Sequence, residues 1–140
     1  MNNSKKRTLA LGLLSAAILA GCATSPAKKS QDDVVVERAK QRWEAILSRD
    51  YATAYALYSP GYRSATSVTD FEIELRLRKI RWISAEYMRH ECEESRCTVK
   101  FKTGYQVNSP VPGLDTYSGY DSSEDQWVKT GGEWWFVPGD

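Results

Sequence analysis

The sequence has few of the residues that build the common catalytic and metal sites. Its 140 residues include a single histidine and three cysteines. A structural zinc site usually takes four ligands from cysteine and histidine pairs. A lone histidine, with no serine or cysteine in a recognisable setting, is not evidence for a nucleophile. We therefore predict no catalytic residue, no metal ion and no cofactor, and a binding role rather than an enzymatic one.

A hydrophobic run long enough to cross a membrane is also missing. Leu9 to Ala20 is an apolar run of twelve residues, broken only by Gly12 and Ser15, whereas a spanning helix needs roughly 20. Three basic residues precede the run, at positions 5–7, and no acidic residue does. A short apolar run after a positively charged start is typical of a signal peptide, which is removed from the mature protein.

Residues 19–22, Leu-Ala-Gly-Cys, follow this run directly and resemble the lipobox of bacterial lipoproteins. The resemblance implies cleavage before Cys22 and attachment of acyl chains such as palmitate to this cysteine, which would hold the protein at a membrane. Ala23 stands where an aspartate would favour the inner membrane. The resemblance therefore implies a lipid-anchored protein of the outer membrane that faces the periplasm. A plain signal peptide with an incidental cysteine is the alternative.

These features divide the chain into a signal peptide (1–21), an acylated cysteine with a flexible tether (22–31) and one folded domain (32–140). Residues 1–21 contain three basic residues and no acidic one, so sixteen basic and eighteen acidic residues remain after cleavage, a net charge of −2. Domains that bind nucleic acids are strongly basic. We therefore expect no nucleic acid as a partner.

Lipidation of Cys22 leaves Cys92 and Cys97 as an even pair, as an oxidising compartment favours. They flank the polar residues "EESR" between two segments of alternating hydrophobicity. In a hairpin the two cysteines would lie opposite each other, within reach of a disulfide bond. We predict this disulfide; a metal site that also uses His90 is the alternative.

The first half of the domain has the pattern of helices. An apolar stripe runs through residues 32–47, with Ser30 and Asp33 placed as a capping box. Residues 51–58, "YATAYALY", predict a second helix that ends at Ser59-Pro60-Gly61. Residues 67–82 predict a third, with Thr69 and Glu72 as its capping box, although their alternation also fits a strand.

The second half has the pattern of strands. Residues 82–92 and 97–107 predict a hairpin, residues 108–119 a loop, and residues 125–137, "DQWVKTGGEWWFV", a second hairpin that turns at Gly131-Gly132. Three helices followed by about four antiparallel strands predict an α+β domain with the helices packed on one face of an antiparallel sheet. The aromatic helices, the long hairpin and the closing "GGEWWFV" resemble the NTF2-like (SnoaL-like, cystatin-related) superfamily. That resemblance implies a cone-shaped fold with a curved antiparallel sheet and an internal pocket, used by some members for catalysis and by many only for binding.

The predicted hairpin register suggests which residues would line such a pocket. If Cys92 faces Cys97, the strand alternation turns Trp82, Glu86 and Met88 to the buried face, together with Phe101. Tyr55 and Tyr58 of the second helix would supply hydroxyl groups at the mouth. The possible pocket therefore consists of Trp82, Glu86, Met88, Phe101, Tyr55 and Tyr58, with Glu86 as a base or ligand anchor. Two separate alternatives remain. A one-residue bulge would turn Glu86 to solvent; independently of this, the tyrosines would be core residues with their hydroxyl groups at the rim.

One cluster of positive charge lies at the end of the third predicted helix. Arg76, Arg78, Lys79 and Arg81 alternate with aliphatic residues, which fits a solvated helix face. On a short tether they would alternatively contact anionic lipid headgroups or an acidic patch of a partner, and that contact would weaken as salt rises.

The function that these features favour is a membrane-anchored envelope lipoprotein that serves as a non-catalytic binding or accessory module. Its expected partners are the membrane, through acyl chains on Cys22, and an envelope protein or a small apolar ligand. The alternative is an isomerase-like or cyclase-like enzyme, or a carrier, that uses the pocket. A pocket filled by aromatic side chains would favour docking to a partner, and an open polar pocket would favour the alternative.

Overall fold

The computed structural model describes residues 29–108, 113 and 116–139 of the chain. The predicted signal peptide, Cys22 and most of the predicted tether therefore lie outside the described residues. Within them, no helix is both long and apolar enough to span a membrane.

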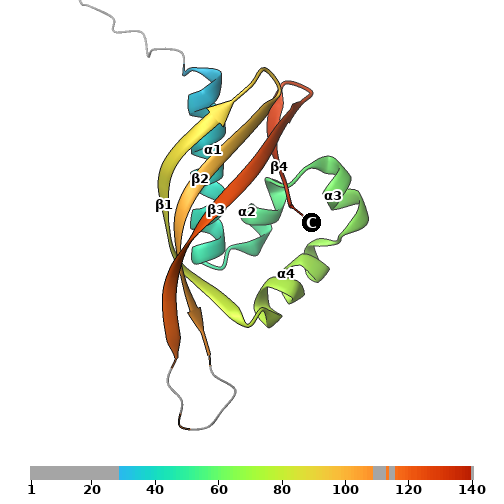
Figure 1. The fold of residues 1–140 in the computed structure, drawn as a ribbon. Coiled ribbons are helices and arrows are strands. Elements are labelled where there is room, and N and C mark those ends of the chain that lie inside the picture. Colours follow the sequence, from blue (N-terminus) through green and yellow to red (C-terminus); the bar gives the residue numbers. More distant parts are fainter. Residues whose placement is uncertain (1–28, 109–112, 114–115, 140) are drawn as a thin grey trace, which may run out of the picture.

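Four helices precede four strands (Figure 1). The helices are α1 (Gln31–Leu47), α2 (Tyr51–Ala56), α3 (Pro60–Ala65) and α4 (Val68–Leu77). The strands are β1 (Ile80–Cys92), β2 (Arg96–Val107), β3 (Tyr117–Thr130) and β4 (Glu133–Val137), and they form one antiparallel sheet in the order β1-β2-β3-β4. This arrangement confirms the predicted α+β fold class.

Local capping explains where the helices begin. The Ser30 hydroxyl oxygen accepts a hydrogen bond from the backbone N–H of Asp33, and the Asp33 carboxylate accepts one from the backbone N–H of Ser30. Together they complete the predicted capping box of α1. Asp50 caps α2 as expected. The predicted capping box of the third helix is wrong, because Ser67 rather than Thr69 is the N-cap of α4.

Ser59-Pro60-Gly61 begins a helix instead of ending one. α2 ends at Ala56, and Pro60 is the first residue of α3, with Ser59 as its N-cap. Proline fits the first turn of a helix because its missing N–H has no partner there in any case. The fourth helix was therefore hidden in residues that the sequence pattern assigned to a turn.

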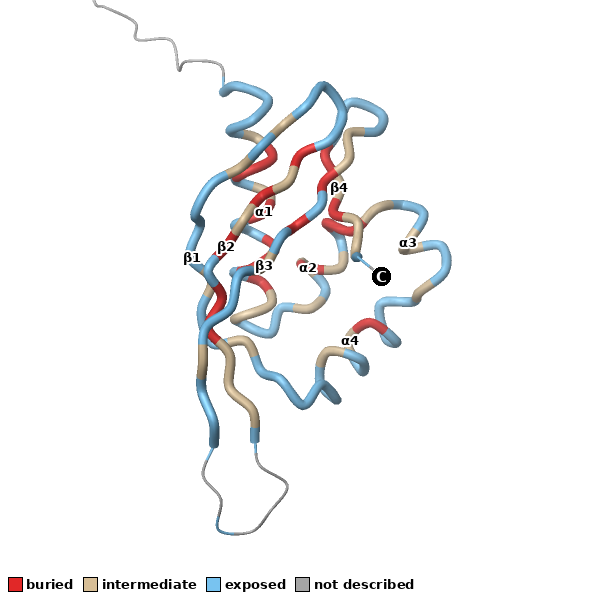
Figure 2. Tube along the Cα trace, viewed as in Figure 1, coloured by how far each residue is buried: buried red, intermediate tan, exposed pale blue. Residues whose placement is uncertain are grey.

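The helices cover one face of the sheet, and the core lies between the two layers (Figure 2). α1 runs along the strands and buries Val35, Ala39 and Trp43 against them. The strands contribute a set of buried side chains from alternating positions: Val99, Phe101, Trp127, Trp134 and Phe136. Every buried hydrophobic residue of the described chain falls between Val35 and Phe136, so the domain holds its own core.

Two bulges in β1 change the predicted register. Cys92 pairs with Cys97 and His90 with Val99, as expected, but the register shifts between Tyr87 and Arg89 and again between Trp82 and Ser84. The first shift places Tyr87 opposite Phe101 and Glu86 opposite Lys102. Each bulge turns the following side chains to the other face of the sheet.

Candidate functional site

The predicted pocket does not form as one site. The first bulge leaves Met88 55% exposed and turns Glu86 to solvent, so both were wrongly placed on the buried face. The second bulge returns Trp82 to the inner side, where it is half-buried. Glu86 is therefore not a desolvated carboxylate of the kind that acts as a buried base.

The interior of the cone is filled by aromatic side chains. Phe101 is 1% exposed, and the centre of its ring lies 5.9 Å from that of Trp43. Trp43 and Trp82 pack edge to face, with their ring centres 5.6 Å apart. Tyr58, predicted at the pocket mouth, packs instead against Phe71 and Phe136 in the core. The space that the resemblance assigned to a ligand is thus occupied by the protein itself.

Tyr55 is likewise a structural residue. Its hydroxyl donates a hydrogen bond to the backbone carbonyl oxygen of Thr66 at 2.7 Å and so ties α2 to the segment before α4. Its ring lies 5.6 Å from that of Phe71. The alternative of core tyrosines therefore describes Tyr55 and Tyr58 correctly.

A solvent-open hollow of about 510 Å³ between α1 and β1 does bring two of the predicted pocket residues together. Glu86 lies at its rim and Phe101 on its floor, beside Trp43. Lys40 and Glu44 of α1 contribute charges of both signs, and the Lys40 ammonium lies over the ring of Tyr87. Because its charges are mixed, this hollow has no evident preference for a charged ligand.

The end of the sheet near the start of α1 carries the predicted disulfide. Cys92 and Cys97 are bonded to each other across the β1–β2 hairpin. The His90 ring nitrogen Nδ1 lies 2.7 Å from the Tyr87 hydroxyl, and Nε2 lies 4.0 Å from a carboxylate oxygen of Asp32. Asp32, His90 and Cys92 lie close enough together for a metal site, but the sulfur of Cys92 is engaged in the disulfide bond. Two available ligands do not make a site of the usual kind.

A buried ion pair joins α1 to β3, and it was not predicted from the sequence. The Arg42 guanidinium of α1 donates a hydrogen bond to the Asp125 carboxylate of β3 at 2.9 Å, with both side chains buried, and stacks 3.6 Å from the centre of the Phe136 ring. Burial raises the pKa of Asp125 from 3.8 to about 6, and the Arg42 charge and the nearby Trp43 indole N–H oppose this rise without cancelling it. The signal in the sequence was the strand alternation, which places Asp125 on the same face as Trp127.

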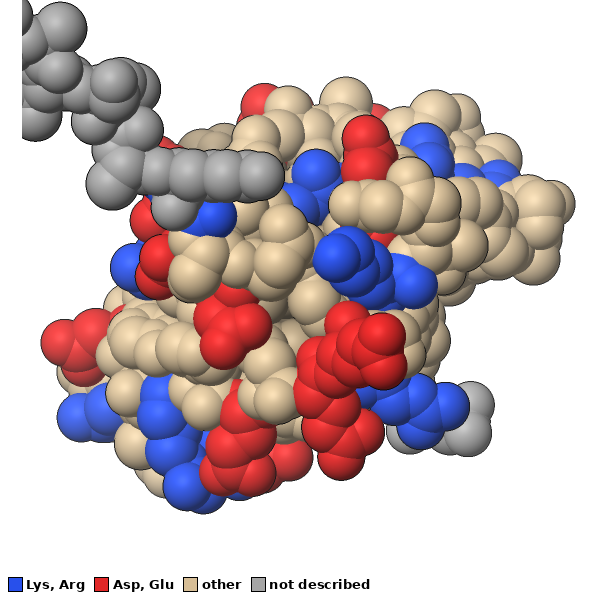
Figure 3. All heavy atoms as spheres, turned by 90° about the horizontal axis from the view of Figure 1, so that it is seen from above, with Lys and Arg blue, Asp and Glu red and all other residues tan. Residues whose placement is uncertain are grey.

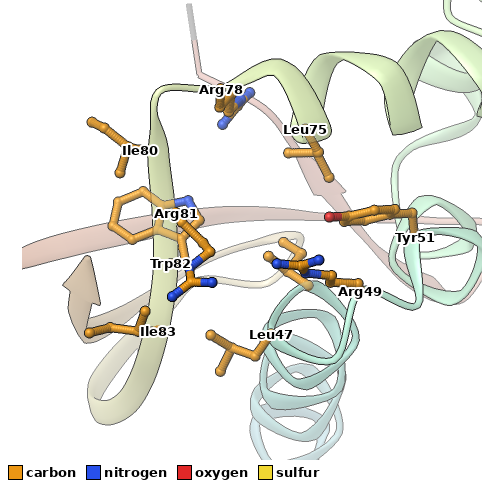
Figure 4. A pocket seen from close by; sticks show the side chains of 10 residues that line it. Leu47, Arg49, Tyr51, Leu75, Arg78, Ile80, Arg81, Trp82 and Ile83 are labelled. Carbon is orange, nitrogen blue, oxygen red and sulfur yellow. The ribbon is translucent and has the colours of Figure 1, made fainter. Parts of the chain in front are cut away.

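A second hollow lies where α1 ends and α4 passes into β1 (Figure 4). It is a hollow of about 220 Å³ lined by Ile46, Leu47, Arg49, Tyr51, Leu75, Arg78, Ile80, Arg81, Trp82 and Ile83. An adjoining hollow adds Arg76, Lys79 and Asn108. We call these residues together the basic groove. Its described lining holds five basic side chains and no carboxylate.

Each basic side chain reaches the groove from a different local structure. Arg49 follows the C-cap of α1 in the left-handed conformation, with φ of 62°. Arg78 is the C-cap of α4, and Arg81 lies on β1, where it hydrogen-bonds to Gln106. Figure 4 shows Arg49 and Arg81 directed into the same space from opposite sides. The basic run at residues 76–81 was noted in the sequence and supplies four of the five basic side chains of the groove. Arg49 was not predicted, because only the fold places it beside them.

The charge of the groove is only partly neutralised. Arg76 pairs with Glu72 at 2.6 Å and Arg78 with Glu74 at 2.5 Å along α4, as exposed i,i+4 pairs. No described carboxylate forms an ion pair with Arg49, Lys79 or Arg81. With Tyr51 and Asn108 as the uncharged polar side chains of its lining, the groove offers several hydrogen-bond donors for an anion.

A scan against protein-family models gives no match, and no curated protein matches the chain in sequence. Solved structures do match. One is a SEC-C motif containing protein from Rhodopseudomonas palustris, with 17% identity over 74% of each chain and a TM-score of 0.54. Another is a protein of the NTF2-like family from Streptomyces avermitilis, with 9% identity over 75% of this chain and 90% of that one and a TM-score of 0.53.

A SEC-C motif containing protein from Psychrobacter arcticus is also similar, with 14% identity over 80% of this chain and 63% of that one and a TM-score of 0.51. At these identities the likeness concerns the fold alone. It confirms that the described chain has the NTF2-like fold that the order of elements and the aromatic residues predicted.

Proposed function

We propose that this chain is a lipid-anchored binding module of a bacterial cell envelope, with no reaction of its own. Anchoring is supported by the lipobox-like residues 19–22 after a charged start and a short apolar run. Attachment to the outer membrane, facing the periplasm, rests on Ala23 and belongs to the same proposal.

One observation carries the non-catalytic part of the proposal. The interior, where enzymes of this fold place their substrate, is occupied by Trp43, Phe101 and Tyr58, whereas the basic groove at the surface is open. Binding through a surface groove needs no reactive group. We therefore propose that the module acts by holding an anionic partner group at its surface, as an accessory to another envelope component.

The anchoring is tested by metabolic labelling of the full chain in a bacterial host with an alkyne analogue of palmitate. We expect label and membrane fractionation for the natural chain and loss of label in Cys22→Ser. The matched control is the double variant Cys92→Ser with Cys97→Ser, which removes the other two cysteines and is expected to keep the label. A labelled Cys22→Ser protein, or an unlabelled natural chain, would refute the anchoring.

The absence of an internal ligand is tested separately, by native mass spectrometry of the domain released from its envelope. We expect the mass of the polypeptide with its disulfide bond and nothing bound in the interior. A reproducible added mass of a few hundred daltons that persists in a variant without the groove charges would instead support a carrier or an enzyme.

A further inference from the structure

The basic groove contains or adjoins aliphatic side chains that the fold leaves in solvent. Leu77 is 77% exposed, Ile80 43% and Ile83 47%. They lie in the same stretch of chain as Arg78, Lys79 and Arg81, around the junction of α4 with β1. Exposed aliphatic residues interspersed with long basic side chains are the pattern of surfaces that lie in the interface of a membrane.

The remainder of the domain has the opposite charge. The mature chain carries a net charge of −2 despite the five basic residues of the groove. Figure 3 looks down on the end where α1 begins, and acidic side chains there lie among basic ones. An anionic surface would therefore attract the groove and not the domain as a whole, so the contact would have a fixed orientation.

The position of the groove relative to the tether fits such a contact. The chain enters the domain at the start of α1 (Figure 1), and the groove residues Leu47 and Arg49 lie at the other end of this helix. The 17 residues of α1 span about 25 Å at 1.5 Å per residue. The stretch from Cys22 to Lys29 reaches about 25 Å when extended. A domain tethered at one end of α1 can therefore lay the other end on the same membrane.

Arg49 adds an independent observation. It is the one non-glycine residue of the described chain with a positive φ, in a position after a helix where glycine is the usual residue. An arginine in this conformation carries a steric cost of about 1 kcal/mol or more. Its side chain projects into the groove (Figure 4) and forms no ion pair with the described residues. A ligand for its charge would account for an arginine there.

We infer that the basic groove and the aliphatic residues around it dock the domain on an anionic phospholipid surface, with α1 lying along the plane of the membrane. The groove holds one phosphate-bearing headgroup between Arg49, Arg81 and Lys79, and Leu77, Ile80 and Ile83 contact the acyl boundary. This inference rests on the proposed anchoring, which would keep the groove close to the lipid at all times and raise its effective concentration there.

The test uses a chain that begins at Ala23, which lacks the acylated cysteine but keeps every core residue. Its binding to vesicles of phosphatidylcholine is compared with binding to vesicles that contain about 30% phosphatidylglycerol. We expect co-sedimentation with the anionic vesicles, at least tenfold weaker binding to the neutral ones, and loss of binding in about 0.5 M salt, because headgroup attraction is screened.

Two triple variants remove the same number of charges. Arg49→Gln with Lys79→Gln and Arg81→Gln changes the groove, and we expect it to bind anionic vesicles at least tenfold more weakly. Arg89→Gln with Arg96→Gln and Lys102→Gln changes exposed residues outside the groove, and we expect it to bind like the unchanged domain. Equal losses in the two variants would reduce the effect to net charge and overturn the inference.

Other outcomes identify other occupants. Groove-dependent binding of monomeric short-chain phosphatidylglycerol without binding to vesicles would overturn membrane docking and indicate a carrier for single anionic amphiphiles. No binding to either would overturn the inference in favour of an acidic protein surface. The chain that begins at Ala23 lacks the anchor, so a negative vesicle result would not contradict the palmitate labelling of the full chain. Failure of the labelling would likewise not contradict the vesicle result.

Discussion

Arg42 lies in the second half of α1 and Arg49 follows the C-cap of this helix, and the surroundings of the two side chains differ sharply. Arg42 is buried, hydrogen-bonded to the Asp125 carboxylate and stacked on Phe136. Arg49 is exposed in the basic groove, in a backbone conformation that costs an arginine energy, and has no ion pair among the described residues. The fold satisfies the first charge and leaves the second available to a partner. The comparison separates an arginine that holds the structure together from one that the structure presents.

The largest expected effect is a loss of stability when the buried arginine, Arg42, is removed. Arg42→Ala leaves the Asp125 carboxylate buried without its cation, and removing one partner of a buried pair typically costs about 3–5 kcal/mol. We expect a fall of that size in the free energy of unfolding, measured by urea denaturation at pH 7. Arg49→Ala, just beyond the end of the same helix, is the control, and we expect it to change the free energy of unfolding by less than about 0.5 kcal/mol. Equal effects of the two substitutions would contradict the distinction drawn between these arginines.

The second effect concerns the pH dependence of stability. Since the pKa of Asp125 is raised to about 6 in the folded protein, the folded state binds a proton more tightly than the unfolded chain. Its contribution to stability is therefore fully present below about pH 3.8 and is lost as the pH rises through about 6. At 1.36 kcal/mol per pH unit, the loss amounts to at most about 3 kcal/mol.

Asp125→Asn removes this titration. We expect the difference in unfolding free energy between the natural domain and Asp125→Asn to change by about 2–3 kcal/mol between pH 4 and pH 7, in the direction that favours the natural domain at low pH. A difference that is constant with pH would show that the carboxylate has an ordinary pKa.

The third effect extends the comparison to the two ends of the molecule. The Cys92–Cys97 bond closes the end near the start of α1, while the groove lies at the other end. A loop this short is worth about 2 kcal/mol in the chain-entropy model. We expect Cys92→Ala with Cys97→Ala to lower the free energy of unfolding by about that amount while vesicle binding through the groove stays unchanged. A reducing agent should have no effect on this variant, and loss of vesicle binding in it would show that the two ends are coupled.

The features that the sequence predicted correctly are mostly local. The capping box of Ser30 and Asp33, the N-cap Asp50 and the pairing of Cys92 with Cys97 depend on residues a few positions apart. The order of the helices and strands follows from such signals together with the hydrophobic pattern, and it was sufficient to predict the NTF2-like fold.

The errors arose where tertiary structure decides. Strand alternation contains no sign of a bulge, so one extra residue in β1 was enough to move Glu86 and Met88 to the outer face. Arg42 and Asp125 are 83 positions apart, and no spacing rule joins them. The groove combines Arg49 with residues 75–83 in the same way. The candidate site was therefore only partly predictable, through the basic run at its α4–β1 side.

The smallest expected effect is the change in stability when the exposed arginine, Arg49, is replaced. Arg49→Gly relieves the left-handed backbone, a gain of about 1 kcal/mol or more, while the added freedom of glycine in the unfolded chain offsets about 0.5–1 kcal/mol of it. We expect the free energy of unfolding to stay constant or rise by up to about 1 kcal/mol, and binding to anionic vesicles to fall. Arg49→Ala keeps the backbone cost but loses the charge, so it should weaken vesicle binding equally without any gain in stability. If Arg49→Gly destabilised the domain by more than 1 kcal/mol, Arg49 would be a structural residue like Arg42, and its conformation would not be evidence for a ligand.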